Sequence, residues 1–177
     1  MGSAGNRMVV STCLQFDSKD HKLKEVARMS EARQDAACVV FEGNVIICGG
    51  FGNDYHGSNT VESYEAVADR WTRMPNMNKR RSNHSLVVVK TKMYVIGGFN
   101  AAKCEVFDNK SKLFVSLNSP FAISANQALS IGSKIFVFQD DNPSVFVYDV
   151  QEDEWSEKSC EAAKNFRWYS SVKLPIY

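Results

Sequence analysis

Short apolar runs and polar turns alternate along this chain, and the same arrangement recurs over most of its length. Its most regular element is an aromatic residue, six intervening residues and a second large apolar residue. The first members of successive pairs are 48, 43 and 41 residues apart, which predicts a tandem array such as a propeller or solenoid. The four pairs are Phe16/Leu23, Tyr64/Trp71, Phe107/Phe114 and Tyr148/Trp155.

The second repeat shows the internal order most clearly. Two apolar runs, at residues 38–41 and 45–48, are joined by Glu42-Gly43-Asn44, a joint that is typical of a tight hairpin. The second run ends in Gly49-Gly50, and after a polar loop two further apolar runs complete the repeat. Four short strands per repeat predict one blade of a β-propeller.

The other repeats extend this arrangement to an all-β, partial propeller. The chain has room for three complete four-stranded blades, for the end of a blade before them, and for only a first strand after them, at Tyr169 to Leu174. The expected boundaries are a flexible N-terminus (1–8), the end of a blade (9–32), three blades (33–80, 81–122 and 123–164) and the first strand of a further blade (165–177).

The recurring residue types have physical roles in such an array. A Gly-Gly doublet that ends a buried strand permits positive φ and a close approach of neighbouring backbone. The aromatic pairs supply the apolar area that joins one blade to the next. In three repeats an Asp follows the aromatic residue (Asp17, Asp108 and Asp149), where its carboxylate can accept backbone amides of the following turn.

The order of apolar run, Gly-Gly, aromatic, six residues and Trp resembles the Kelch repeat, and the resemblance covers residues 9–174. Met29 to Arg33 and Met77 to Arg81, each Met-x-x-x-Arg before a first strand, are also Kelch-like. The resemblance implies a Kelch-type β-propeller, similar to the Kelch region of BTB-Kelch proteins. The sequence departs from it in the last full repeat, which has Gln139-Asp140 in place of Gly-Gly.

The blade count leaves two architectures open. Closed Kelch propellers hold more blades than this chain supplies, so it forms either an arc of a larger protein or a strained, incomplete four-blade ring. We favour the arc. An arc that stands alone should expose blade faces and strand edges, and should therefore be prone to self-association.

Composition excludes several function classes. The formal net charge of +1 removes any global electrostatic case for binding nucleic acid or an anionic membrane. The five cysteines occur singly and mostly within apolar strands, so we interpret them as reduced core residues of a cytoplasmic protein. The three histidines lack a second ligand at metal-like spacing, so neither a metal site nor a cofactor is predicted.

Catalysis has little support in the sequence. No nucleophile elbow or phosphate-binding glycine loop is present, since Gly49-Gly50-Phe51-Gly52 follows the Kelch strand pattern. Kelch-type oxidases need a copper site built from tyrosines and histidines, which three scattered histidines do not supply. We therefore expect a binding protein rather than an enzyme.

Binding residues are expected in loops at one rim of the blades. One group follows the second strand of a repeat, and its longest loop combines an aromatic anchor with glycine, although it could equally be a solvated loop. A second group lies fourteen residues before each Gly doublet, a position that in similar proteins faces the central opening. The predicted partner-binding residues are Asp35, Phe51, Asn53, Asp54, Tyr55, His56, Asn83, Phe99, Asn100, Arg167 and Trp168.

A short basic cluster lies beside this rim. Arg81 is expected to be structural by analogy with Arg33, while Lys79 and Arg80 are either solvated or face an acidic partner.

The resemblance implies a protein-interaction module similar to the substrate-binding half of BTB-Kelch adaptors of cullin-RING ubiquitin ligases. The 177 residues contain no BTB segment, so contact with the ligase would depend on a BTB region outside this sequence. The alternative is an actin-binding, cytoskeleton-associated Kelch protein, and a Kelch-type enzyme is the least favoured interpretation. The expected partner is a protein, either a substrate or actin.

Overall fold

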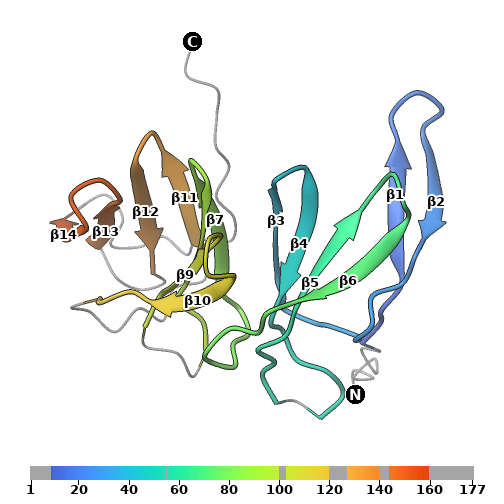
Figure 1. Cartoon of the computed structure of the whole chain (residues 1–177), viewed down its shortest axis with the longest axis horizontal. Coiled ribbons are helices and arrows are strands. Elements are labelled where there is room, and N and C mark those ends of the chain that lie inside the picture. Colours follow the sequence, from blue (N-terminus) through green and yellow to red (C-terminus); the bar gives the residue numbers. More distant parts are fainter. Residues whose placement is uncertain (1–8, 55, 100–102, 120–126, 140–143, 160–177) are drawn as a thin grey trace, which may run out of the picture.

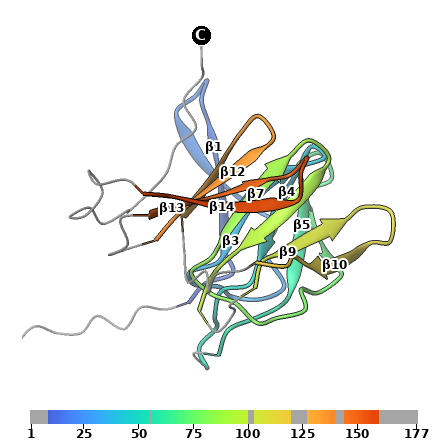
Figure 2. The ribbon, with the colours of Figure 1, turned by 90° about the vertical axis from the view of Figure 1, so that its left-hand side faces the viewer.

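The computed structural model describes residues 9–54, 56–99, 103–119, 127–139 and 144–159. Every regular element in these residues is a β-strand. The strands form one two-stranded and three four-stranded antiparallel sheets, which fan out in chain order as an arc (Figures 1 and 2). This arrangement confirms the predicted fold class, a partial β-propeller.

The sheets are named here in chain order as the half-blade and blades 1 to 3. The half-blade contains β1 (Cys13–Asp17) and β2 (Lys22–Val26). Blade 1 contains β3 (Ala37–Phe41), β4 (Asn44–Cys48), β5 (Val61–Glu65) and β6 (Arg70–Met74). Blade 2 contains β7 (Ser85–Val89), β8 (Lys92–Ile96), β9 (Glu105–Asp108) and β10 (Leu113–Ser116). Blade 3 contains β11 (Gln127–Ile131), β12 (Lys134–Phe138), β13 (Ser144–Asp149) and β14 (Glu154–Ser159).

The repeated pairs of the sequence are direct cross-strand neighbours in the last two strands of every sheet. Phe16 opposes Leu23, and Tyr64 opposes Trp71. The ring centroids of Tyr64/Trp71, Phe107/Phe114 and Tyr148/Trp155 are 5.0, 5.1 and 4.9 Å apart. Blade 3 keeps all four strands although its Gly-Gly doublet is missing, because its apolar pattern alone sets the register.

The core consists of two apolar layers between successive blades. Phe41 and Ile46 of blade 1 pack with Met93 and Phe107 of blade 2. In the second layer, Tyr94 of blade 2 packs with apolar residues of blade 3, which include Ile135, Phe146 and Tyr148. Each complete aromatic pair therefore faces the preceding blade, and the face-to-face stacking of blades supplies most of the apolar burial.

The Gly-Gly doublets allow this stacking at the blade ends. Gly49 and Gly50 have φ of 62° and 82°. A Cβ added at Gly49 would lie 2.5 Å from His84 Cε1 and 2.7 Å from the Arg81 carbonyl oxygen of blade 2. The doublet is thus required both by its backbone conformation and by the closeness of the next blade.

The cysteines only partly follow the prediction of a reduced core. Cys48 and Cys104 are buried and Cys13 is partly exposed, but Cys38 is exposed, which contradicts its assignment to the core. Cys38 is exposed because its side of β3 is turned toward the half-blade, which has two strands where the other sheets have four. Cys160 and the predicted final strand lie outside the described residues.

Candidate functional site

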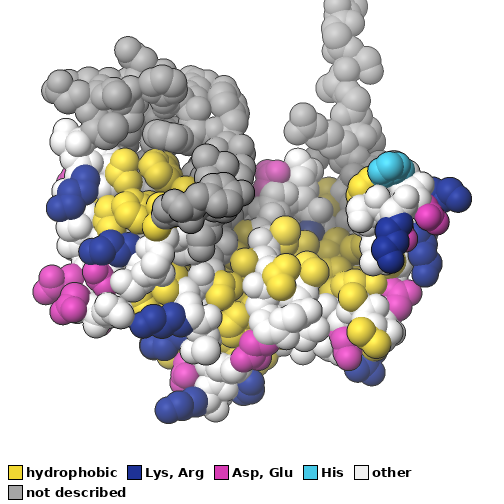
Figure 3. All heavy atoms as spheres, turned by 90° about the horizontal axis from the view of Figure 1, so that it is seen from above, with side chains coloured by type: hydrophobic (Ala, Val, Ile, Leu, Met, Phe, Trp, Pro, Cys, Tyr) yellow, Lys and Arg dark blue, Asp and Glu magenta, His cyan; other side chains and the backbone are white. Residues whose placement is uncertain are grey.

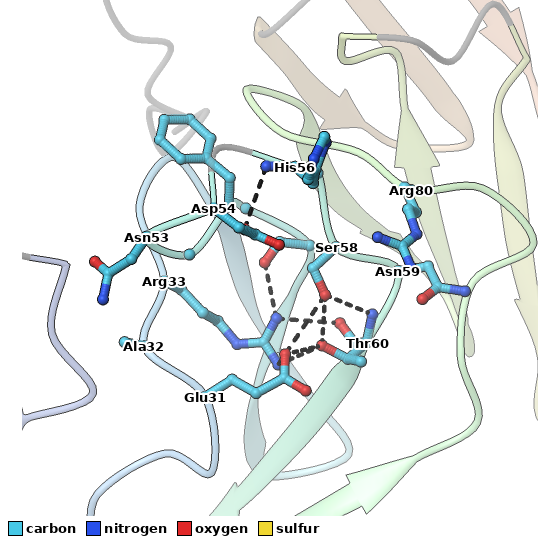
Figure 4. Close-up of a pocket in the computed structure, with 15 residues that line it drawn as sticks. Glu31, Ala32, Arg33, Asn53, Asp54, His56, Ser58, Asn59, Thr60 and Arg80 are labelled. Atoms are coloured by element: carbon cyan, nitrogen blue, oxygen red, sulfur yellow. Dashed lines mark hydrogen bonds and ion pairs between the residues drawn. The ribbon is translucent and has the colours of Figure 1, made fainter.

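A pocket of about 510 Å³ opens at the rim of blade 1, at the end of the strands where β4 runs into the loop toward β5. The loop residues Phe51 to Asp54 and His56 to Thr60 form one wall, and the segment before β3, from Glu31 to Arg33, forms the other (Figure 4). Arg80, which precedes β7, extends the pocket toward blade 2.

Main-chain hydrogen bonds hold this loop at both ends. Gln34 and Phe51 exchange two bonds of 2.9 Å, so the loop leaves β4 beside the segment before β3. At its other end the Ser58 amide donates to the Gly50 carbonyl at 2.7 Å, and the Arg81 amide donates to the Ser58 carbonyl at 2.8 Å. The loop is therefore fixed to both blade 1 and blade 2.

A buried ion pair lies beneath the pocket. The Arg33 and Glu62 side chains are 2% and 1% exposed, and Arg33 Nη2 donates to Glu62 Oε1 at 2.8 Å. Arg33 Nη1 also donates to the Gly49 carbonyl at 2.8 Å, and the Ser30 amide donates to Glu62 Oε2 at 2.8 Å. Burial alone would raise the pKa of Glu62, but these hydrogen bonds from Arg33 and Ser30 lower it below the ordinary value.

Above this pair, a polar network reaches the pocket surface. Arg33 Nη2 donates to Thr60 Oγ1 at 2.8 Å, and Thr60 Oγ1 donates to Glu31 Oε2 at 2.7 Å. The Ser58 hydroxyl lies 2.8 Å from that of Thr60. Burial would raise the pKa of Glu31, but hydrogen bonds from Thr60 and Arg73 and the charge of Arg33 lower it. The Glu31 carboxylate at the pocket is therefore ionised at neutral pH.

Blade 2 repeats the ion pair but not the polar network. Arg81 and Glu105 are 0% and 1% exposed and 2.7 Å apart, and Arg81 Nη1 donates to the Gly97 carbonyl at 2.6 Å. This agrees with the structural role predicted for Arg81. Lys79 and Lys103 occupy the positions of Glu31 and Thr60, so blade 2 lacks the hydroxyl and carboxylate lining of blade 1.

The structure brings four of the predicted binding residues together. Phe51, Asn53, Asp54 and His56 all line the pocket, and Asp54 Oδ1 accepts the amide of His56 at 3.2 Å. Asn53, Asp54 and His56 are exposed.

The remaining predicted residues lie elsewhere. Asp35 and Asn83 are exposed at equivalent positions of blades 1 and 2, outside the pocket lining. Phe99, in the corresponding loop of blade 2, is 67% exposed. Tyr55, Asn100, Arg167 and Trp168 lie outside the described residues.

Sequence reasoning missed several of the pocket residues. Glu31 and Thr60 were not predicted, and Arg80 was expected to be solvated or to face an acidic partner. The available signals were weak: Thr60 immediately precedes a predicted strand, and Glu31 lies inside the Met-x-x-x-Arg motif.

The chemistry of this rim suits recognition of polar groups. Its lining mixes carboxylates, hydroxyls, amides and a guanidinium, with no three His, Cys, Asp or Glu side chains grouped as metal ligands anywhere in the described residues. The described segments contain no helix long and apolar enough to cross a membrane. Viewed from above, charged side chains lie along the outer margin of the arc and hydrophobic ones gather nearer its middle (Figure 3).

Comparison with known proteins is consistent with this geometry. The Kelch motif family matches residues 32–78 and 80–115. Kelch-like protein 35 of Mus musculus is 28% identical over 149 residues, which cover 80% of this chain and 26% of that protein. Kelch-like protein 40 of Xenopus tropicalis is 29% identical over 107 residues, which cover 59% of this chain and 17% of that protein.

Among solved structures, the one titled "Structure of YjhT" matches with a TM-score of 0.70 at 17% identity. The match covers 88% of this chain and 60% of that one, and it bears on the fold alone. This chain thus spans about a quarter or less of the length of the two Kelch-like relatives.

Proposed function

Because this chain is a Kelch-repeat protein, we propose that it is the substrate-recognition part of a Kelch-like adaptor for cullin-RING ubiquitin ligation. A Kelch-repeat region is a protein-interaction module. The narrower role as a ligase adaptor is supported by the similarity to Kelch-like proteins and by the loop-built pocket at the rim of blade 1.

The observation that carries the proposal is the contrast between a fixed base and an exposed lining at this pocket. Arg33 and Glu62 are almost fully buried and tie the loop to the sheet, whereas Asn53, Asp54 and His56 are exposed in the pocket lining. Binding residues on loops that a rigid scaffold positions are the usual design of a recognition site.

The pocket is an anchor point rather than a whole interface. A stable protein interface covers about 800 Å² per partner, and a few residues near its centre carry most of the binding energy. We infer that one polar side chain of the partner enters the pocket, while Asp35, Asn83 and Phe99 contact the partner around it.

The experiment is proximity labelling with the full-length gene product in its own cells, with and without inhibition of cullin neddylation. The proposal expects labelled proteins whose abundance rises when the ligases are inhibited, and loss of their labelling in an Asp54→Ala, His56→Ala variant. Labelled proteins with unchanged abundance would contradict the adaptor role. Cosedimentation of the chain with filamentous actin would support the cytoskeletal alternative instead.

A further inference from the structure

The glycine-rich loop of the blade 1 pocket uses its main-chain donors inside the protein. The amides of Phe51 and Ser58 donate to main-chain carbonyls at 2.9 and 2.7 Å. The amides of His56 and Thr60 donate to side-chain oxygens at 3.2 and 3.1 Å. A loop that binds phosphate instead points several amides at the ligand. The selectivity of this pocket therefore depends on its side chains.

The guanidinium and hydroxyl donors beneath the pocket are also directed inward. The two terminal nitrogens of Arg33 make four hydrogen bonds inside the protein, at 2.8 to 3.4 Å. The Thr60 hydroxyl donates its single hydrogen to Glu31, so the Ser58 hydroxyl donates either to Thr60 at 2.8 Å or to Glu31 at 3.5 Å. The hydrogens of this network thus point toward Glu31, and its outward groups are oxygen acceptors.

The Glu31 carboxylate already binds a guanidinium of the chain itself. Arg73 of β6 donates to Glu31 Oε1, and the two side chains are 52% and 33% exposed. An exposed ion pair of this kind is weak, because water solvates both groups, so a second cation can share or replace this contact. Arg80, the cation that blade 2 contributes, lies at the opposite end from Glu31 of the residues drawn in Figure 4. The end of the pocket at Glu31 is therefore suited to a cation.

Blade 2 carries the opposite charge at the equivalent positions. Lys79 stands at the place of Glu31, and Lys103 at the place of Thr60, and both lysines are exposed. A cation that fits the blade 1 pocket would be repelled at the same place of blade 2. This repulsion would fix where along the rim the partner binds, because specificity needs unfavourable alternatives as well as a favourable site.

We propose that the partner side chain that enters this pocket is cationic, an arginine or a lysine, and that the carboxylates of Glu31 and Asp54 bind it. This inference rests on the proposed function and names the chemistry of the bound group. Arginine and lysine side chains carry only donors, which match a lining whose outward groups are acceptors. The Ser58 oxygen, which keeps a lone pair, provides a third acceptor beside the two carboxylates.

The test selects a random peptide library, displayed on phage, on the intact chain and measures the affinity of the enriched peptides by fluorescence anisotropy. We expect these peptides to share an arginine or a lysine. Replacing that residue by citrulline or acetyl-lysine, which removes the charge, should weaken binding about tenfold or more.

Variants of the chain test the two carboxylates. Glu31→Gln and Asp54→Asn keep an acceptor oxygen for the Thr60 hydroxyl and the His56 amide, so both should melt at the parent temperature and bind these peptides about tenfold more weakly. The matched control is Glu65→Gln, which removes the same charge from an exposed ion pair with Arg70 outside the pocket and should leave the affinity unchanged.

Two kinds of result would overturn the inference. Peptides that lose binding to an Asp54→Ala, His56→Ala variant, yet share no basic residue or lose as much affinity for Glu65→Gln as for Glu31→Gln, would leave the recognition site standing without its cation. A selection in which no peptide depends on Asp54 or His56 would overturn the recognition site itself, and the inference with it.

Discussion

The backbone amide of Asn83 donates a hydrogen bond of 2.8 Å to the carbonyl of Asp35, and the two residues hold the same position in successive blades. Both have a left-handed backbone, with φ of 52°. Asn and Asp tolerate this conformation better than other non-glycine residues. The bond joins blades 1 and 2 through the main chain and leaves both side chains exposed at the rim.

A substitution at Asp35 tests this backbone requirement. Asp35→Val should destabilise the fold by about 1–2 kcal/mol, because a β-branched residue is strained at positive φ. Asp35→Gly should stay within about 1 kcal/mol of the parent, since glycine adopts this conformation without strain. Urea unfolding measures both variants, and equal stability of the two would contradict the account.

The Gly49 position tests the close approach of blades 1 and 2. Gly49→Ala should lower the free energy of unfolding by about 3 kcal/mol or more. The added Cβ would clash with the His84 ring and the Arg81 carbonyl, and alanine is also strained at the positive φ of this position. The control is Gly43→Ala, which has a φ of 80° but no atom within 4 Å of the added Cβ, and which should cost only about 1 kcal/mol. If thermal unfolding shows similar losses of stability for both variants, the contact between blades 1 and 2 is less tight than described.

Removing one partner of the buried Arg81/Glu105 pair should be strongly destabilising. Arg81→Met leaves the carboxylate of Glu105 buried without a counter-charge, which costs about 3–5 kcal/mol. The surface pair Arg70/Glu65, with side chains 65% and 51% exposed, provides the control, because Arg70→Met should cost about 1 kcal/mol or less. Chemical denaturation of both variants distinguishes an anchoring pair from an ordinary surface pair.

The buried His84 predicts a pH dependence of stability. Burial, together with the charge of Arg81, lowers the pKa of His84 to about 3, while in the unfolded chain it is about 6.5. Below pH 6.5 the unfolded chain binds a proton that the folded chain does not, so stability falls as the pH decreases from 6.5 toward 3. Between pH 7 and pH 5 the loss should be about 2 kcal/mol.

The control for this effect is His84→Gln, which cannot titrate in this range. Each protein is compared with its own stability at pH 7. Between pH 7 and pH 5 the variant should lose less stability than the parent, because the contribution of His84 is missing. An identical decrease in the parent and in His84→Gln would assign the pH dependence to other groups.

The strands were predictable from sequence because their apolar runs serve the stacking of blades. The spacing of Tyr64 and Trp71 fixed both the strand type and the residues that meet across the sheet. The binding pocket was only half predictable. Loop position identified Asp54 and His56, but Glu31 and Thr60 enter the site through the Arg33 network, a three-dimensional contact between segments about thirty residues apart that has no local sequence signal.

The exposure of Cys38 could not be predicted from its own strand. β3 has the apolar composition of a buried strand, but among the described residues the neighbouring half-blade places only the two strands β1 and β2 beside blade 1. Burial of an inner strand in a propeller depends on the blade beside it rather than on its own sequence.

The most direct test of the central claim, that the rim of blade 1 recognises a protein partner while the blades hold it in place, is a quantitative affinity capture. The bait is the intact chain, compared with an Asn53→Ala, Asp54→Ala, His56→Ala variant and with Lys90→Ala, an exposed turn position between β7 and β8 on the opposite rim. With unchanged melting temperatures, the account predicts at least a tenfold loss of the captured partner, about 1.4 kcal/mol or more, for the pocket variant only. Equal recovery by all three baits would contradict it.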